Sequence, residues 1–329
     1  MRLRPRPHAG RADPGGVRAA HSVIEPENGA NYRHSKTFYA PTWFTDALAY
    51  PFERRIIEID GCPIHWRAWG NPTSPVLVLV HGGGAHSGWW DNIAPLLAHH
   101  RYVIAPDLSG HGDSGRRSEY SLGHWAQEII AVADAVSTGA QPAVIGHSMG
   151  GWVAATAAIQ HPAAIDGIVV IDSPLRDRAP EGGRLRNRGA KPRGYSSRAE
   201  ITSRFRVVPA QPVTLPYVTS HIAADSVRRS GRRWFWKFDP LVFALPDSDF
   251  GPIDPEPLER MLESMQCRTA FVRSERGIVS REMARRIESA MQLRGPFLEL
   301  AEAGHHPMLD QPLALVATLR TVLEMWSIT

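Results

Sequence analysis

The chain alternates short, continuous apolar runs with longer amphipathic segments. The apolar runs, four or five residues each, lie at 76–80, 102–105, 143–146, 168–172, 269–272 and 297–300. They lack period-two alternation, as expected for strands buried on both faces of a parallel sheet. Helices are predicted between them, where apolar residues recur at steps of three and four, at 90–100, 122–136, 150–162, 280–292 and 312–326.

Alternating strands and helices imply right-handed crossovers and a doubly wound α/β sheet. An antiparallel entry hairpin is predicted over 53–70, where Asp60-Gly61 suits a tight turn because glycine tolerates positive φ. The hairpin brings the expected sheet to eight, mostly parallel strands. We find no internal repeat.

The alternation of predicted strands and helices is interrupted once, from 174 to 266, where Pro, Arg and aromatic residues are abundant. We predict a mainly helical cap inserted there, after the sixth strand. The α/β core is then divided into residues 51–173 and 267–329, and residues 1–50 form an N-terminal extension that we expect to be partly disordered.

Composition fits a globular protein, since 43% of the 329 residues are hydrophobic. The longest aliphatic runs are far shorter than the roughly 18 residues that span a bilayer. The first twenty residues lack the apolar centre of a secretory signal, so we expect a flexible tail. Cys62 and Cys267 lack the spacing of a zinc site or disulfide framework, which favours a cytoplasmic location.

The basic charge is concentrated at the N-terminus. Residues 1–18 carry five arginines against Asp13, which equals the net charge of +4 of the whole chain. The remainder is neutral overall, so we expect no nucleic-acid partner.

The stretch Gly146-His147-Ser148-Met149-Gly150 joins a predicted strand to a predicted helix. Ser148 would then lie on a sharp turn at which side chains on the two glycines collide with the strand and helix. The Met149 N–H would lie at the helix start, where unpaired donors favour negative charge. We predict Ser148 as a nucleophile, with a tight turn that lacks chemistry as the alternative.

Two further segments supply partners for such a nucleophile. His81-Gly82-Gly83-Gly84 follows the strand at 76–80, and acyl transfer needs backbone N–H donors aimed at the oxyanion. Gly83 is the candidate donor beside Met149, with a flexible glycine turn as the alternative. A hydroxyl also needs a base, and His305 in the loop after the last apolar run is the candidate, whereas its neighbour His306 is expected to point elsewhere.

These motifs together resemble the α/β-hydrolase superfamily over residues 53–326. HGGG, DLSGHGDSG at 107–115, GHSMGG at 146–151 and AGHHPMLDQP at 303–312 follow the family's order and separations. The resemblance implies the serine-nucleophile, esterase-like branch with a cap, and it makes Asp107 and His111 structural residues beside the active-site mouth. A serine nucleophile disfavours the haloalkane dehalogenase and epoxide hydrolase branches.

The chain departs from the family in its acidic residue. Members usually carry an Asp just after the seventh strand, where this sequence has Gly277 and Ile278. Some relatives place the acid at the end of the sixth strand, which here is Asp172. A carboxylate there would reach the outer nitrogen of the His305 ring and fix its tautomer. Glu275 is the alternative acid.

The predicted cap carries ten Lys or Arg against three acids over 176–206. A solvated surface is the ordinary interpretation, and steering of an anionic substrate is the alternative. Trp89, Trp234 and Trp236 are candidate substrate contacts, with aromatic packing as the alternative.

We therefore expect a serine hydrolase that cleaves a small-molecule carboxylic ester or lactone through an acyl-enzyme. The reaction needs no metal or organic cofactor. The alternatives are hydrolysis of a carbon–carbon bond in a β-diketone-like compound and non-catalytic binding of a small ligand, as in hormone-receptor relatives. A monomer or homodimer is expected.

Overall fold

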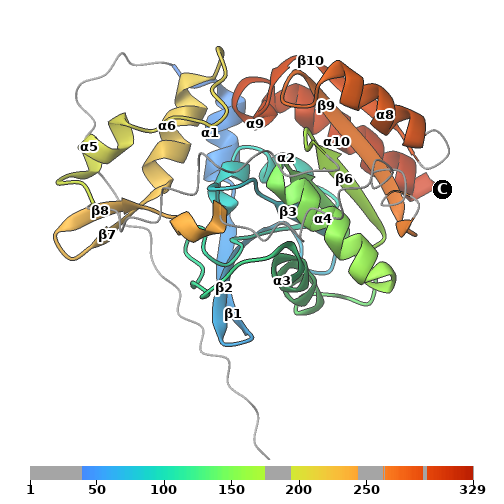
Figure 1. Cartoon of the computed structure of the whole chain (residues 1–329), viewed down its shortest axis with the longest axis horizontal. Coiled ribbons are helices and arrows are strands. Elements are labelled where there is room, and N and C mark those ends of the chain that lie inside the picture. The colour runs from blue at the N-terminus through green and yellow to red at the C-terminus, as the bar shows by residue number, and fades with distance from the viewer. Residues whose placement is uncertain (1–38, 175–193, 244–261, 263, 292–294, 329) are drawn as a thin grey trace, which may run out of the picture. The chain divides into compact units, whose positions relative to one another are not determined.

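The protein contains one large mixed sheet (Figure 1). The computed structural model describes residues 39–174, 194–243, 262, 264–291 and 295–328. The sheet has eight strands in the order β1-β2-β4-β3-β5-β6-β9-β10. Their bounds are β1 Phe52–Ile59, β2 Cys62–Trp69, β3 Val76–Val80, β4 Tyr102–Pro106, β5 Ala143–His147, β6 Gly167–Ile171, β9 Arg268–Arg276 and β10 Phe297–Gly304.

The pairing confirms the predicted fold class. β1 pairs antiparallel with β2 and β2 antiparallel with β4, and the remaining pairs are parallel. The entry hairpin turns at Asp60 and Gly61, whose φ angles are 48° and 70°. Two successive positive φ angles are typical of the tight turn whose twist matches that of the flanking strands.

The central strands are buried on both faces, which explains their continuous apolar runs. In β3, Leu77 and Leu79 belong to one hydrophobic cluster, and Val76, Val78 and Val80 belong to the other. The helices α3 (Leu122–Asp134), α4 (Met149–Gln160) and α8 (Arg281–Met291) contribute to the valine side, and α10 (Pro312–Ile328) contributes to the leucine side.

The predicted helix over 90–100 is shorter than expected. The chain forms a 3-10 turn, η1 (Ser87–Trp90), and one α-helical turn, α2 (Ala94–Leu97). Pro95 lacks the N–H that a longer helix would need at that position. A second short helix, α9 (Pro307–Asp310), precedes α10.

The described part of the segment between β6 and β9 contains both helices and strands. It includes the helices α5 (Arg198–Ser203) and α6 (Pro216–Asp225) and a 3-10 turn, η5 (Pro240–Phe243). Between them lies a separate antiparallel hairpin of β7 (Val227–Ser230) and β8 (Arg233–Trp236). β8 carries three consecutive aromatic residues that are half-buried, so it shows no alternation by which sequence analysis would find it.

Part of the stretch assigned to the N-terminal extension is ordered. Helix α1 (Thr42–Ala49) buries Phe44, whose ring centroid lies 4.8 Å from that of Tyr217 in α6. The arginine-rich stretch 1–18 and most of the basic stretch 176–206 lie outside the described residues. Among the described residues, every helix falls short of the length and apolarity that a membrane-spanning segment needs.

Candidate active site

Ser148 lies on the bend between β5 and α4. Its backbone has φ 54° and ψ −120°, a conformation that L residues rarely adopt and that costs about 1 to 3 kcal/mol. A Cβ on Gly146 would lie 2.0 Å from the Gly150 carbonyl oxygen, and one on Gly150 would lie 2.4 Å from the Val80 carbonyl oxygen. The two glycines are therefore needed to let the strand and helix meet at this angle.

Ser148, His305 and Asp172 form one hydrogen-bonded chain. The Ser148 Oγ lies 3.0 Å from His305 Nε2, and His305 Nδ1 lies 2.8 Å from Asp172 Oδ2. The Asp172 residue is completely buried and His305 is 3% exposed. The three residues follow β5, β10 and β6, so the carboxyl ends of parallel strands bring them to one edge of the sheet.

The end of β9 and the loop after it hold the Asp172 carboxylate through their backbone. The Ile278 N–H donates to Asp172 Oδ2 at 2.9 Å, and the Ser274 N–H donates to Oδ1 at 3.3 Å. A Cβ on Gly277 would lie only 2.1 Å from Asp172 Oδ2. The glycine at the family's usual acid position thus leaves the space that the Asp172 carboxylate occupies.

The alternative acid, Glu275, has a different partner. Its carboxylate accepts the N–H of Glu302 at 2.7 Å, where β10 departs from regular pairing with β9. The structure therefore places Asp172, and not Glu275, in hydrogen-bond contact with the His305 ring.

The glycine-rich loop runs against the bend at Ser148. A Cβ on Gly82 would lie 3.3 Å from the Ser148 Cβ, and one on Gly83 would lie 3.5 Å from the Met149 Sδ. Met149 is the first residue of α4, and the first N–H groups of a helix have no partner within it. The glycine-rich loop therefore lies next to both Ser148 and the first residue of α4.

His81 fixes this loop. Its Nε2 accepts the Leu108 N–H at 3.1 Å, so Nδ1 carries the proton and donates to the Gly82 carbonyl at 2.8 Å. From the inserted segment, the Phe243 ring lies 3.4 Å from the position of a Cβ on Gly83.

Two residues that the sequence analysis missed, His147 and Ser173, form hydrogen bonds with the backbone of His305 and Ser148. His147 Nε2 lies 2.7 Å from the His305 carbonyl oxygen, to which it donates, and Ser173 Oγ donates to the Ser148 carbonyl at 2.7 Å. Each is the neighbour of a predicted site residue. A polar residue next to a candidate site residue is the signal that would have found them.

The Ser148 hydroxyl is hydrogen-bonded to His305, and His306 has other neighbours. The His306 ring lies 5.3 Å from the ring of Trp89, and the backbone N–H of His306 donates to Gln211 Oε1 at 2.9 Å. Trp89 also packs against Phe205 of the inserted segment.

Of the other two predicted aromatic contacts, Trp236 packs against Phe205, and Trp234 lies beneath the Arg198 guanidinium at 6.0 Å. Trp89 therefore contacts the ring of His306, which in turn contacts the ring of His305. Trp234 and Trp236 instead pack within the inserted segment.

Asp107 and His111 have the structural surroundings that were expected of them. The Asp107 carboxylate accepts the N–H groups of Ser87 at 2.6 Å and Asp113 at 2.9 Å. It also bonds His65 Nδ1 at 2.8 Å. The buried His111 ring packs against His81 and Trp125.

Burial keeps the surrounding imidazoles neutral. Desolvation lowers the pKa of His81 to about 4 and, together with the nearby His305, that of His306 to about 3. It also holds the pKa of His111 and of His147 well below the usual histidine value. At pH 7 none of these four rings adds a positive charge beside His305.

These buried histidines predict a loss of stability in acid. At pH 5 an unfolded histidine is protonated, whereas His81 and His306 stay neutral in the fold, so the unfolded state binds more protons. The free energy of unfolding should therefore fall below pH 6.5, by about 2 kcal/mol per such histidine at pH 5.

Urea unfolding of the wild type and of His306→Gln at pH 7 and pH 5 measures this fall. The variant should lose about 2 kcal/mol less than the wild type between the two pH values. An equal loss in both proteins would mean that His306 titrates normally in the fold.

Within the part of the chain that the structure describes, two groups of side chains have metal-ligating atoms within 4.8 Å of one another: His147, His305 and His306, and His65, Asp107 and Asp113. In the first group, His147 and His305 already form hydrogen bonds with protein atoms, and in the second group His65 bonds Asp107. A zinc centre needs ligands about 2 Å from the ion. Neither group fits a resident metal without giving up these bonds.

Comparison with known proteins gives a consistent result. A sequence model of the "Alpha/beta hydrolase family" matches residues 77–319. Over 97 residues, 30% of this chain and 36% of the relative, the sequence is 37% identical to a pimeloyl-(acyl-carrier protein) methyl ester esterase of Klebsiella pneumoniae. It is 35% identical over 102 residues, with the same coverage, to a 2-hydroxymuconate semialdehyde hydrolase of a Pseudomonas species.

The alignments are partial, and the chain spans about a third of the length of the curated relatives it matches. Among solved structures, a thioesterase domain from the curacin biosynthetic pathway superposes with a TM-score of 0.69. The superposition covers 82% of this chain and 99% of that one at 24% identity, which is a likeness of fold.

Proposed function

Because the chain belongs to the alpha/beta hydrolase family, we propose that it is a serine hydrolase that cleaves a carboxylic ester or lactone through an acyl-enzyme. The observation that carries the proposal is the chain of contacts from Ser148 Oγ to His305 Nε2, at 3.0 Å, and from His305 Nδ1 to Asp172, at 2.8 Å. These are the distances at which a base can take the proton of a hydroxyl nucleophile.

In the acylation step, the Ser148 oxygen attacks the carbonyl carbon while His305 Nε2 accepts the hydroxyl proton. Asp172 accepts the Nδ1–H of His305 and stabilises the imidazolium that forms. The N–H groups of Gly83 and Met149 bind the oxyanion that develops on the carbonyl oxygen. Collapse of this intermediate expels the alcohol, which takes its proton from His305.

Water then cleaves the acyl-enzyme. His305 removes a proton from the water, and the same two N–H groups stabilise the second oxyanion before Ser148 leaves with the proton from His305. The neutral state of His147 and His306 supports this cycle, because a charged neighbour would disfavour the imidazolium on which both steps depend. All proposed steps use groups of the chain, the substrate and water.

Carbon–carbon bond hydrolysis is the second candidate, because one relative is named a 2-hydroxymuconate semialdehyde hydrolase. The same nucleophile, base and oxyanion donors would serve a β-diketone-like substrate. Steady-state assays on p-nitrophenyl esters, lactones and a vinylogous 1,5-diketone, run side by side, separate the two candidates by kcat/KM.

Labelling with a fluorophosphonate tests the proposal directly. The wild type should be labelled at one site and should turn over short p-nitrophenyl esters many times. Ser148→Ala should lose both the label and the turnover while it retains the wild-type circular dichroism spectrum. A wild type that binds small ligands without labelling or turnover would instead be a non-catalytic relative, and labelling that persists in Ser148→Ala would contradict the assigned nucleophile.

A further inference from the structure

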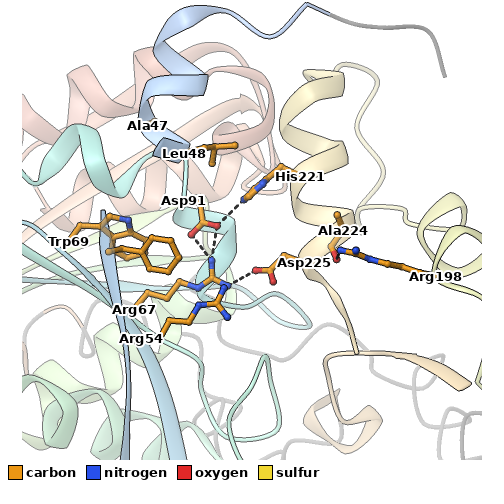
Figure 2. Close-up of a pocket in the computed structure, with 11 residues that line it drawn as sticks. Ala47, Leu48, Arg54, Arg67, Trp69, Asp91, Arg198, His221, Ala224 and Asp225 are labelled. Atoms are coloured by element: carbon orange, nitrogen blue, oxygen red, sulfur yellow. Dashed lines mark hydrogen bonds and ion pairs between the residues drawn. The ribbon is translucent and has the colours of Figure 1, made fainter. Parts of the chain in front are cut away.

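A cavity of about 240 Å³ lies where β1 and β2 meet α1, α5 and α6 (Figure 2). The cavity is lined by none of Ser148, His305 and Asp172. Part of its wall is apolar, formed by Ala47, Leu48, Phe52, Trp69 and Ala224. The rest of the wall is charged.

Arg67 is the buried centre of the charged wall. Its Nη1 donates to both oxygens of Asp91, at 2.7 and 2.6 Å, and its Nη2 donates to Asp225 at 2.5 Å. His221 Nε2 also contacts Asp91, at 2.8 Å, and Lys237 Nζ contacts Asp225, at 3.4 Å. Both carboxylates of the cavity are thus already engaged by cationic or imidazole partners.

Among the described residues, Arg54 has no such partner. It is directly opposite Arg67 in the β1–β2 register, and like charges at opposite positions of an antiparallel pair are destabilising. Figure 2 shows the two side chains next to each other. The described residues place no carboxylate within ion-pair distance of Arg54, whose guanidinium lies 5.6 Å from the Phe52 ring.

Arg198 enters the same cavity from α5. Its Nη2 donates to the Ala224 carbonyl at 2.9 Å, and within the described part of the chain it too has no carboxylate at ion-pair distance. Three guanidinium groups therefore line the cavity with two carboxylates, Asp91 and Asp225, both of which are bonded to Arg67.

We propose that this cavity binds a small organic anion that carries a carboxylate. Arg54 and Arg198 provide planar donor groups suited to a carboxylate, and the apolar wall formed by Ala47, Leu48 and Trp69 accommodates the carbon skeleton. The anion supplies a counter-charge for Arg54 that no carboxylate of the described residues provides at ion-pair distance. Because Arg54 lies on the sheet and Arg198 on the inserted segment, the bound anion joins the two.

Isothermal titration at constant ionic strength, with succinate, benzoate and inorganic phosphate as separate probes, tests the proposal. At least one of the two organic acids should bind with a stoichiometry of one and a millimolar or tighter Kd. Arg54→Gln and Arg198→Gln should each weaken this binding at least about tenfold, the loss expected for one charge-assisted contact.

The matched control is Arg55→Gln. Arg55 is on the same strand, but it points to the other face, where it pairs with Glu53 and lies over Trp66, so its replacement should leave the Kd unchanged. In the absence of ligand, Arg54→Gln should melt at the wild-type temperature or above it, because it removes a like-charge contact. Binding of phosphate alone, no binding of either organic acid, or equal weakening in Arg55→Gln would overturn the proposal.

Discussion

Replacing His305 by glutamine should reduce kcat for ester hydrolysis on the order of 10⁶-fold, the loss expected when the base of a Ser-His pair is removed. Glutamine is similar in size and polarity to histidine, but it cannot take the Ser148 proton, which His305 Nε2 faces at 3.0 Å. Oxyanion donors and substrate binding alone would then support the residual rate.

His306→Gln is the matched control, because it changes the adjacent residue in the same loop. The His306 ring packs against Trp89 and makes no contact with the Ser148 hydroxyl, so kcat should stay within about tenfold of the wild type. The kcat and KM of both variants on p-nitrophenyl butyrate, with circular dichroism as a folding check, give the comparison. If His306→Gln lost activity and His305→Gln kept it, the base would be His306.

The elements that were predictable from sequence are those whose cause is local. β3 reads as five apolar residues because alternate side chains enter different hydrophobic clusters on its two faces. Gly146 and Gly150 flank Ser148 because a Cβ at either position would collide with backbone, and that requirement is visible in six residues of sequence.

The inserted segment was less predictable because its contacts are distant in sequence. The ion pair of Arg67 and Asp225 joins the core to α6, and the two residues are 158 positions apart. No sequence pattern near either residue predicts that it pairs with the other. From sequence, the aromatic residues of β8 were candidate substrate contacts. In the structure Trp236 packs against Phe205 and Tyr195, and Trp234 lies beneath the Arg198 guanidinium.

The acid that contacts His305 was hard to predict for the same reason, because its contacts are distant in sequence. Sequence left both Asp172 and Glu275 open, because Asp172 comes at the end of the predicted sixth strand and Glu275 just after the predicted seventh. What separates them is the space left by Gly277, since any side chain there would meet the Asp172 carboxylate. The absence of a side chain at Gly277, after β9, thus leaves room for the carboxylate of Asp172, after β6. Only the structure shows that these two positions meet.

Asp172→Asn should therefore lower kcat on the order of 10⁴-fold with little change in KM. The asparagine amide can still reach His305 Nδ1, but it can present an N–H to it, which favours the tautomer that leaves Nε2 protonated and unable to accept the Ser148 proton. Glu275→Gln should change kcat less than about threefold, because the glutamine oxygen can still accept the Glu302 N–H. Collapse of activity in Glu275→Gln alone would move the acid to that residue.

Moving the carboxylate from residue 172 to residue 277 tests whether its position in the chain matters. Asp172 has a positive φ of 41°, so glycine is tolerated there, and Asp172→Gly removes the carboxylate that a side chain at 277 would meet. Adding Gly277→Asp to that variant places a carboxyl group in the vacated space beside His305 Nδ1. The double variant should then recover at least about tenfold in kcat over Asp172→Gly, with a pH profile close to that of the wild type. Gly277→Asp alone should be impaired, because its side chain and Asp172 would compete for one space, and a double variant no faster than Asp172→Gly would show that the carboxylate acts only from residue 172.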